Sequence, residues 1–249
     1  MTSVATVLKW DPPLIAVWKW SEAQHPRDQG GRFTHERFGG VATIAIHPDE
    51  GKLVAQTQRR YVSRLDAETR KALEDYTRYT PEMEELNHAL RFERGPMQPA
   101  LQALNTQLHR VIANAPSFPK PVTVWRGVDT TGAPPRMKTG DRIQLKGYQS
   151  TSLDPEQAFT RAWASANVDP EQAWTPKAKV PHPPIVFRIR ATQGLDLRSV
   201  SILPNEQEIL LGTHETYMVR KIQHNVTFIP SRNFDHTPIT ATVIDLDQQ

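Results

Sequence analysis

The feature that most constrains the fold is a change in the spacing of apolar residues near Pro121. Upstream, from Lys52 onwards, apolar residues recur every three or four positions, which is typical of amphipathic helices. Downstream, apolar and polar residues alternate, which is typical of strands with one buried face. Helices followed by strands predict the α+β class, with N-terminal helices packed on a mostly antiparallel sheet.

Local signals divide the helical part into four segments. The first contains Leu53 to Leu65, and Asp66 can cap the second. Thr80-Pro81 is a start signal for the third, with threonine as the N-cap and proline in the first helical position. The fourth covers Pro99–Ala113, and the prolines that follow end it.

The alternating part predicts a series of short strands. These are 122–128, 142–145, 148–151, 184–190, 205–211, 216–222, 225–229 and 239–246, with one more upstream at 41–46. A fifth helix begins at Asp154-Pro155. Loops are expected at 129–140, 167–184 and 194–205.

Composition excludes several classes of protein. The 249 residues are 38% apolar, which is enough for one large domain with an extension. Cysteine is absent, so disulfides and thiolate metal sites are excluded, and the scattered histidines lack metal-ligand spacing. A net charge of +3 does not suggest a dedicated nucleic-acid binder. No apolar run approaches the ~20 residues that cross a membrane, and no signal peptide is evident, so a soluble, cytosol-compatible protein is expected.

Residues 1–40 differ from the rest of the chain. They contain Trp10, Trp18 and Trp20, and paired glycines interrupt regular structure. We therefore expect an N-terminal extension at 1–40, either docked or poorly ordered, and a main domain at 41–249. The run His25–Phe33 resembles short segments of phage virion and head-assembly proteins, which hints at a phage origin.

Two carboxylates mark the candidate site. In a strand at 205–211, Glu206 and Glu208 would point to the same face with Cα atoms about 6–7 Å apart. Two acids on one face suit acid/base or charge-stabilising chemistry. The alternative is an exposed edge strand with solvated carboxylates.

Further motifs precede these acids in a fixed order. Trp125–Gly127 lies on a strand, Gly147–Leu153 carries a Ser-Thr-Ser run, and Glu206–Glu208 follows. Upstream, Tyr76-Thr77 and Leu86–Arg91 lie on the helices. Together they resemble the Arg–Ser–Glu class of mono-ADP-ribosyltransferases of bacterial toxins and phages. The resemblance covers about residues 60–225 and implies a split β-sandwich that binds NAD, with 41–249 as the catalytic domain.

The resemblance implies a role for each residue of the core set. Arg126 would bind the NAD diphosphate or an adjacent ribose, and the Gly127 backbone would bind the nicotinamide carboxamide. Ser150 would orient Glu208, whose carboxylate stabilises positive charge on the ribose as nicotinamide leaves. Glu206 would position and deprotonate the acceptor. A glutamate two residues before the catalytic one implies an arginine acceptor.

Secondary NAD contacts are also implied, and for three of them a structural alternative stays open. Phe159 would lie over the nicotinamide or be a core residue of its helix. Asn87 and Arg91, four residues apart on one helix face, would reach the adenosine phosphate or be solvated. Arg142 would be another phosphate contact. Arg161 lies one residue out of register with the second loop arginine of the family.

The expected function is NAD-dependent transfer of ADP-ribose to arginine of a host protein. NAD is the substrate, and no metal, membrane or nucleic acid is expected. The expected setting is the host cytoplasm, with packaging in a virion or delivery as an effector. Two alternatives stay open, an NAD glycohydrolase toxin and a non-enzymatic virion module that keeps the fold. A two-carboxylate glycosidase fits poorly, because its acids usually lie on different elements across a cleft.

Overall fold

A computed structural model describes residues 48–78, 80–92, 95–128, 137–166, 184–230 and 238–249. All of these belong to one compact unit of the chain, Phe38–Gln249. The predicted extension at 1–40, the predicted strand at 41–46 and most of the predicted loops at 129–140 and 167–184 lie outside the described residues.

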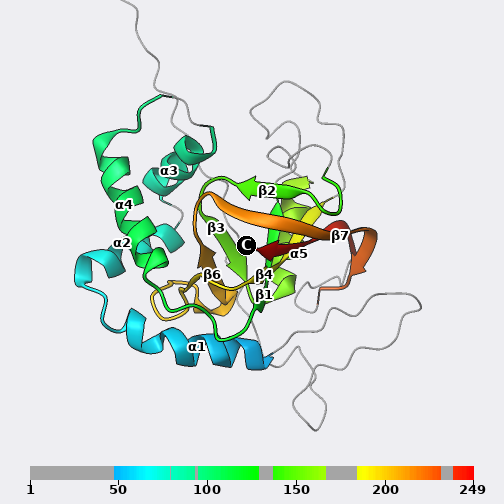
Figure 1. The fold of residues 1–249 in the computed structure, drawn as a ribbon, viewed down its shortest axis with the longest axis horizontal. Coiled ribbons are helices and arrows are strands. Elements are labelled where there is room, and N and C mark those ends of the chain that lie inside the picture. The colour runs from blue at the N-terminus through cyan, green and yellow to red at the C-terminus, as the bar shows by residue number, and fades with distance from the viewer. Residues whose placement is uncertain (1–47, 79, 93–94, 129–136, 167–183, 231–237) are drawn as a thin grey trace, which may run out of the picture. The chain divides into compact units, whose positions relative to one another are not determined.

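Four helices precede the sheet, as predicted. They are α1 (Pro48–Val62), α2 (Ala67–Thr77), α3 (Pro81–Phe92) and α4 (Pro99–Ala113). The predicted cap of α2 is confirmed, because the Asp66 carboxylate accepts a hydrogen bond from the Thr69 N–H at 2.7 Å. The four helices lie beside the sheet (Figure 1). Their apolar stripes contribute to one buried cluster.

Eight strands of the described residues form one hydrogen-bonded sheet. They are β1 (Val122–Val128), β2 (Arg142–Leu145), β3 (Gln149–Ser152), β4 (Ile185–Ala191), β5 (Leu195–Asp196), β6 (Glu208–Leu211), β7 (Glu215–Phe228) and β8 (Ile239–Gln248). Their order is β2-β7-β8-β4-β1-β3-β6-β5, and every pairing except β4 with β8 is antiparallel. The α+β class and the mostly antiparallel sheet are therefore confirmed.

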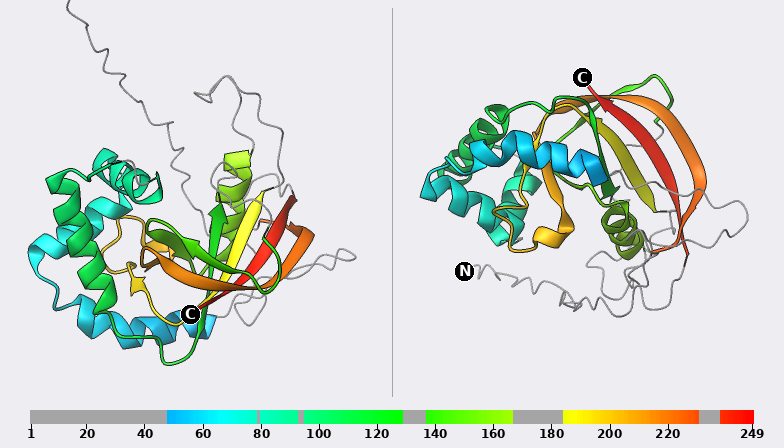
Figure 2. Two further views of the ribbon diagram at one scale, coloured as in Figure 1. Left: turned by 45° about the horizontal axis from the view of Figure 1, so that its top comes forward. Right: turned by 90° about the horizontal axis from the view of Figure 1, so that it is seen from below.

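The sheet bends back on itself at the junction of β1 and β3. These strands share a single register pair, Trp125 with Ser152, whereas β1 and β4 pair along their whole length. Only residues 146–148 connect β2, at one end of the sheet, to β3 in its other part. A link this short brings the two parts of the sheet face to face (Figure 2). Apolar side chains from both parts form one core cluster between them. This arrangement explains why the fold resembles a split sandwich.

Helix α5 (Pro155–Ala166) covers the opposite face of β1. Its buried side chains Ala158, Phe159 and Ala162 form a separate apolar cluster with Trp125 and residues of β4 and β8. Since β3 ends at Ser152 and α5 starts at Pro155, the turn between them lies beside the β1–β3 junction. The sheet junction and the helix start together form the pocket described below.

Two strand predictions need correction. The strand predicted at 205–211 begins only at Glu208, because Pro204–Glu206 forms a 3-10 helix. The strands predicted at 216–222 and 225–229 are one strand, β7, with irregularities between Val219 and Lys221 and between Gln223 and Val226. Asn225 has a φ of 57°, so a β-bulge rather than a turn explains the break in alternation.

Candidate active site

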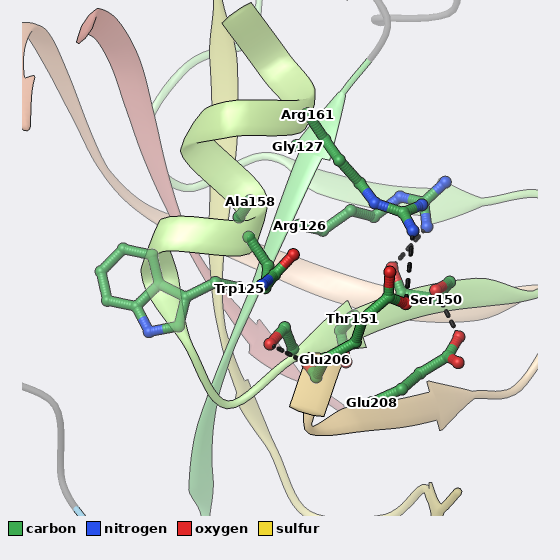
Figure 3. A pocket seen from close by; sticks show the side chains of 11 residues that line it. Trp125, Arg126, Gly127, Ser150, Thr151, Ala158, Arg161, Glu206 and Glu208 are labelled. Atoms are coloured by element: carbon green, nitrogen blue, oxygen red, sulfur yellow. Dashed lines mark hydrogen bonds and ion pairs between the residues drawn. The ribbon is translucent and has the colours of Figure 1, made fainter. Parts of the chain in front are cut away.

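An open pocket lies where β1, β3, the first turns of α5 and the segment before β6 meet (Figure 3). The residues that line it are Trp125, Arg126, Gly127, Ser150, Thr151, Ser152, Gln157, Ala158, Arg161, Glu206 and Glu208. All four residues predicted to be catalytic are among them. They come from three segments that are far apart in the sequence.

Arg126 lies in the middle of β1 and faces the pocket. Its Nη1 donates a hydrogen bond to the Ser150 carbonyl oxygen at 2.7 Å, which ties β1 to β3 beyond their single register pair. Val122 and Val124 share its side of the strand and are fully buried in the core between the two parts of the sheet. The strand therefore holds a guanidinium at the end of an apolar row.

Glu208 is the first residue of β6 and forms the inner wall of the pocket. Only 4% of its surface is exposed. The Ser150 hydroxyl donates a hydrogen bond to its Oε1, from the adjacent strand β3 (Figure 3). Burial raises the pKa of the Glu208 carboxyl above its ordinary value, the Ser150 hydrogen bond opposes this, and the neighbouring Glu206 charge adds to it.

Glu206 lies at the rim of the same pocket and is not part of the sheet. Gln207 adopts the left-handed conformation, with φ 51° and ψ 43°, so the backbone turns between the two acids. The Ser152 hydroxyl donates to the Glu206 carbonyl oxygen at 2.6 Å and holds the turn against β3. The predicted strand placement of Glu206 is therefore wrong, although both acids still line one pocket.

Ser152 also supports the start of α5. Its hydroxyl accepts a hydrogen bond from the Asp154 N–H at 2.9 Å, and the Asp154 carboxylate accepts one from the Glu156 N–H at 3.0 Å. Thr151 bonds the Ile209 carbonyl oxygen at 2.6 Å. These contacts join the helix start, β3 and β6, so they fix the position of both acids relative to α5.

Gly127 is the point where α5 packs against β1. A Cβ atom there would lie 2.3 Å from the Ala158 carbonyl oxygen and 2.6 Å from the Ala162 nitrogen. No side chain fits between the strand and the helix backbone at this position. Helix packing is thus one physical reason for glycine, beside the ligand approach expected from the sequence.

Phe159 does not face the pocket. It is fully buried, its ring stacks on Phe228 with centroids 4.6 Å apart, and it lies 6.4 Å from the Trp125 ring. Phe159 is a core residue of its helix, as the structural alternative expects, and its contact with nicotinamide stays a prediction. Successive positions of a helix point in different directions, and Phe159 falls on the face that packs against the sheet.

The remaining predicted NAD contacts lie away from the pocket lining. Asn87 Oδ1 accepts a hydrogen bond from the Tyr148 N–H at 3.0 Å, and a Cβ at Gly147 would lie 3.3 Å from the Arg91 Cγ. Asn87 and Arg91 therefore share the α3 face that contacts the turn into β3. Arg142 is exposed on β2, opposite Met218. Their roles as ligand contacts stay predictions.

Two features of the site escaped the sequence reasoning. Gln157 lines the pocket, and its spacing of four from Arg161 on α5 is a helical signal that could have identified it. Arg161 Nη2 lies 3.5 Å from Glu206 Oε2. Since 45 positions separate these two residues, no local pattern indicates their contact.

Neither a metal centre nor a membrane-spanning helix is found among the described residues. No group of three or more histidine, aspartate or glutamate side chains there is placed to hold a metal ion. None of the helices in the same residues has the length and apolar character needed to span a membrane.

Comparisons with known proteins place this geometry in context. The sequence model of the ADP-ribosyltransferase exoenzyme family matches residues 53–245, which include every residue that lines the pocket. Comparison with curated proteins gives no match.

Several solved bacterial toxins share the fold. Plx2a, an ADP-ribosyltransferase toxin from Paenibacillus larvae, is 16% identical with a TM-score of 0.55, over 81% of this chain and 96% of that one. Vis from Vibrio splendidus is 17% identical with a TM-score of 0.57, over 81% and 82%. The enzymatic component C2-I of the Clostridium botulinum C2 toxin is 22% identical with a TM-score of 0.55, over 80% and 46%.

Proposed function

The chain belongs to the ADP-ribosyltransferase exoenzyme family, as its motifs predicted, and we propose that it transfers ADP-ribose from NAD to an arginine side chain of a target protein. The observation that carries this proposal is the pair of acids in one pocket. Glu208 is buried against Ser150, whereas Glu206 lies at the rim. Two carboxylates in different surroundings suit two different tasks.

The lining of the pocket suits NAD. NAD carries an anionic diphosphate and a cationic nicotinamide on one ribose. Arg126 provides a guanidinium for the anionic part, and it is already directed at β3 by its bond to the Ser150 carbonyl. Glu206 and Glu208 provide negative charge in the same pocket.

Glu208 is suited to stabilise the bond-breaking step. As the bond between ribose and nicotinamide breaks, positive charge develops on the ribose, and a fixed carboxylate in a water-poor wall stabilises that charge. The Ser150 hydroxyl fixes the carboxylate without adding charge. In this proposal Ser150 positions the Glu208 carboxylate, and Glu208 acts on the ribose.

Glu206 is suited to prepare the acceptor. A guanidinium has a pKa above ~12, so its attack requires a base that can take a proton. The Glu206 side chain is 25% exposed, so a side chain of another protein can reach it. Among the similar structures, Vis is described in complex with agmatine, a compound that carries a guanidinium group. That complex supports a guanidine acceptor here.

The test uses labelled NAD with agmatine, and separately with a host lysate followed by mass spectrometry of the modified residue. We expect label on agmatine and on arginine. Glu208→Gln should lower both transfer and NAD hydrolysis by about 10²–10³-fold, whereas Glu206→Gln should lose transfer and keep hydrolysis. Free ADP-ribose without any labelled acceptor would instead favour the glycohydrolase alternative. Absence of NAD turnover would favour the non-enzymatic one.

We further propose that the protein acts inside a host cell, as a phage-borne or bacterial effector. The similar structures are bacterial toxins, and the run His25–Phe33 resembles phage virion segments. Immunodetection in purified virions and in the cytosol of exposed cells tests this setting. A protein found in neither would contradict it.

A further inference from the structure

Gln157 brings a side-chain amide into the pocket. It lies in the first turn of α5, lines the pocket and is half-buried. No hydrogen bond joins this amide to another group of the described residues. An amide carries an acceptor oxygen and two donor hydrogens, so Gln157 presents both kinds of group to a ligand.

The start of α5 lies against the turn that carries Glu206. The Asp154 N–H donates to the Ser152 hydroxyl at 2.9 Å, and that hydroxyl donates to the Glu206 carbonyl oxygen at 2.6 Å. A single serine side chain therefore joins the helix start to the backbone of Glu206. Because Gln157 follows Asp154 by three residues, it lies only ~5 Å further along the helix axis.

The face of α5 that carries Gln157 is directed at the same rim of the pocket. Gln157 and Arg161 are four residues apart, so they share one face of the helix. Arg161 Nη2 lies 3.5 Å from Glu206 Oε2, and Figure 3 shows its side chain reaching from α5 toward Glu206. The helix backbone packs directly on Gly127, which fixes the direction of this face.

Arg161 leaves part of the Glu206 carboxylate available. Its contact is with Oε2, and no contact among the described residues involves Oε1. Arg161 makes a further interaction besides this one, so its side chain is held beside Glu206. A fixed positive charge there disfavours the cationic form of a second guanidinium, which favours transfer of its proton to Glu206.

A guanidinium that enters this rim needs more than one acceptor. It is planar and carries five N–H donors in fixed directions, and each donor that loses water costs free energy unless it finds a partner. Glu206 Oε1 can accept from one nitrogen of the group. The amide oxygen of Gln157 is a neutral acceptor on the neighbouring helix, so it can bond a second nitrogen without taking the proton.

We propose that Gln157 binds the acceptor guanidine, which lies between Gln157 on α5 and Glu206 on the turn before β6. This inference rests on the proposed function, because it requires an arginine acceptor in this pocket. Glu206 takes the proton from the nitrogen that attacks the ribose, and the Gln157 oxygen accepts a hydrogen bond from another nitrogen of the same group. A second nitrogen is what distinguishes a guanidine from an amine, so the Gln157 contact favours guanidine acceptors.

The first experiment measures the KM for agmatine and the KM for NAD in the transfer reaction. Gln157→Met keeps the length of the side chain and its suitability for a helix, but it removes the amide. Loss of a hydrogen bond to a charged group should raise the KM for agmatine by about 10-fold, and the KM for NAD should rise less. A higher KM for NAD with an unchanged KM for agmatine would overturn the inference.

The second experiment uses the sign of an introduced charge. Gln157→Lys places a cation at this position, so it should raise the KM for agmatine further than Gln157→Met does. If Gln157 instead faced the NAD diphosphate, the lysine would lower the KM for NAD, which would contradict the proposal. Gln102→Met is the matched control, because Gln102 is exposed in the interior of α4 and does not line the pocket. The control should keep both KM values.

The third experiment needs no active variant. The side-chain amide signal of Gln157 in the NMR spectrum of the wild type is identified by its loss in either variant. It should shift when agmatine is added together with carba-NAD, an analogue that is not cleaved. Transfer to agmatine by the wild type, with an unshifted signal and an unchanged KM for agmatine in both variants, refutes only this inference. A wild type that transfers no ADP-ribose to agmatine or to protein arginine refutes the proposed function as well.

Discussion

Replacing Gly127 by alanine tests whether the pocket depends on direct contact between α5 and β1. The new Cβ would lie 2.3 Å from the Ala158 carbonyl oxygen and 2.6 Å from the Ala162 nitrogen. Ordinary contacts between such atoms are about 3.5 Å, so the shortfall is about 1 Å. Both atoms belong to the helix backbone and cannot rotate away, so α5 itself has to move.

The cost of this shift can be estimated in two ways. Overpacking of a close contact destabilises a protein by about 1–3 kcal/mol. For a chain of this size, each kcal/mol lowers Tm by about 2–4 °C, which gives a loss of roughly 2–12 °C. Since α5 carries Gln157 and Arg161 into the pocket, a displacement of about 1 Å can also reduce the rate by about 10²-fold.

Thermal unfolding and NAD hydrolysis measure the two effects separately. Gly51→Ala is the matched control, because Gly51 lies inside α1 and its Cβ would meet only side-chain atoms, at 3.4 Å. Alanine in a helix interior is better than glycine by about 0.5–1 kcal/mol, so the control should gain stability and keep activity. A Gly127→Ala enzyme with wild-type Tm and wild-type hydrolysis would refute the reasoning.

Three further predictions concern the two acids and the link into β3. Glu208→Gln should lower NAD hydrolysis by about 10²–10³-fold, because the carboxylate that stabilises the ribose charge is lost, and an activity assay measures this effect. The same variant should raise the free energy of unfolding by about 0.5–2 kcal/mol at neutral pH, because it removes a buried charge, and calorimetry measures this gain. Since burial raises the Glu208 pKa, NAD hydrolysis should be lost as pH falls through a value above the ordinary ~4.3. Glu206→Gln should move this acidic limb of the pH–rate profile to lower pH, because the Glu206 charge also raises the Glu208 pKa. A profile that does not move would contradict the electrostatic coupling of the two acids. The stability gain of Glu208→Gln should likewise shrink as pH falls and the wild-type carboxyl is protonated. Tyr148→Phe removes the hydroxyl bond to the Asn105 carbonyl oxygen, at 2.9 Å, and should cost about 1 kcal/mol in chemical denaturation.

The elements with strong local signals could be predicted from the sequence. Helix α4 and strand β1 have the predicted bounds, because Pro99 and Pro116 flank the helix and the strand starts immediately after Pro121. The Asp66 cap is likewise a contact between neighbours in the chain. Where hydrogen bonds join residues three or four positions apart, sequence pattern and structure agree.

The misplaced residues depend on contacts between distant segments. A left-handed Gln207 has no sequence signature, because glycine or asparagine usually occupies that conformation. What holds it is the bond from Ser152 to the Glu206 carbonyl, 54 positions away. The burial of Phe159 also depends on a distant segment, because its stacking partner Phe228 lies at the end of β7. Periodicity identifies a helix but does not tell which face the rest of the protein covers.

The turn at Gln207 also explains how two neighbouring glutamates can have different chemistry. On a regular strand, Glu206 and Glu208 would share one face and similar burial. The left-handed residue instead leaves Glu208 in the wall, 4% exposed, and brings Glu206 to the rim beside Arg161. A buried carboxylate can contact a small ligand that fills the pocket, but not a residue on the surface of another protein. Under the proposed function, this difference alone assigns Glu208 to the ribose and Glu206 to the acceptor.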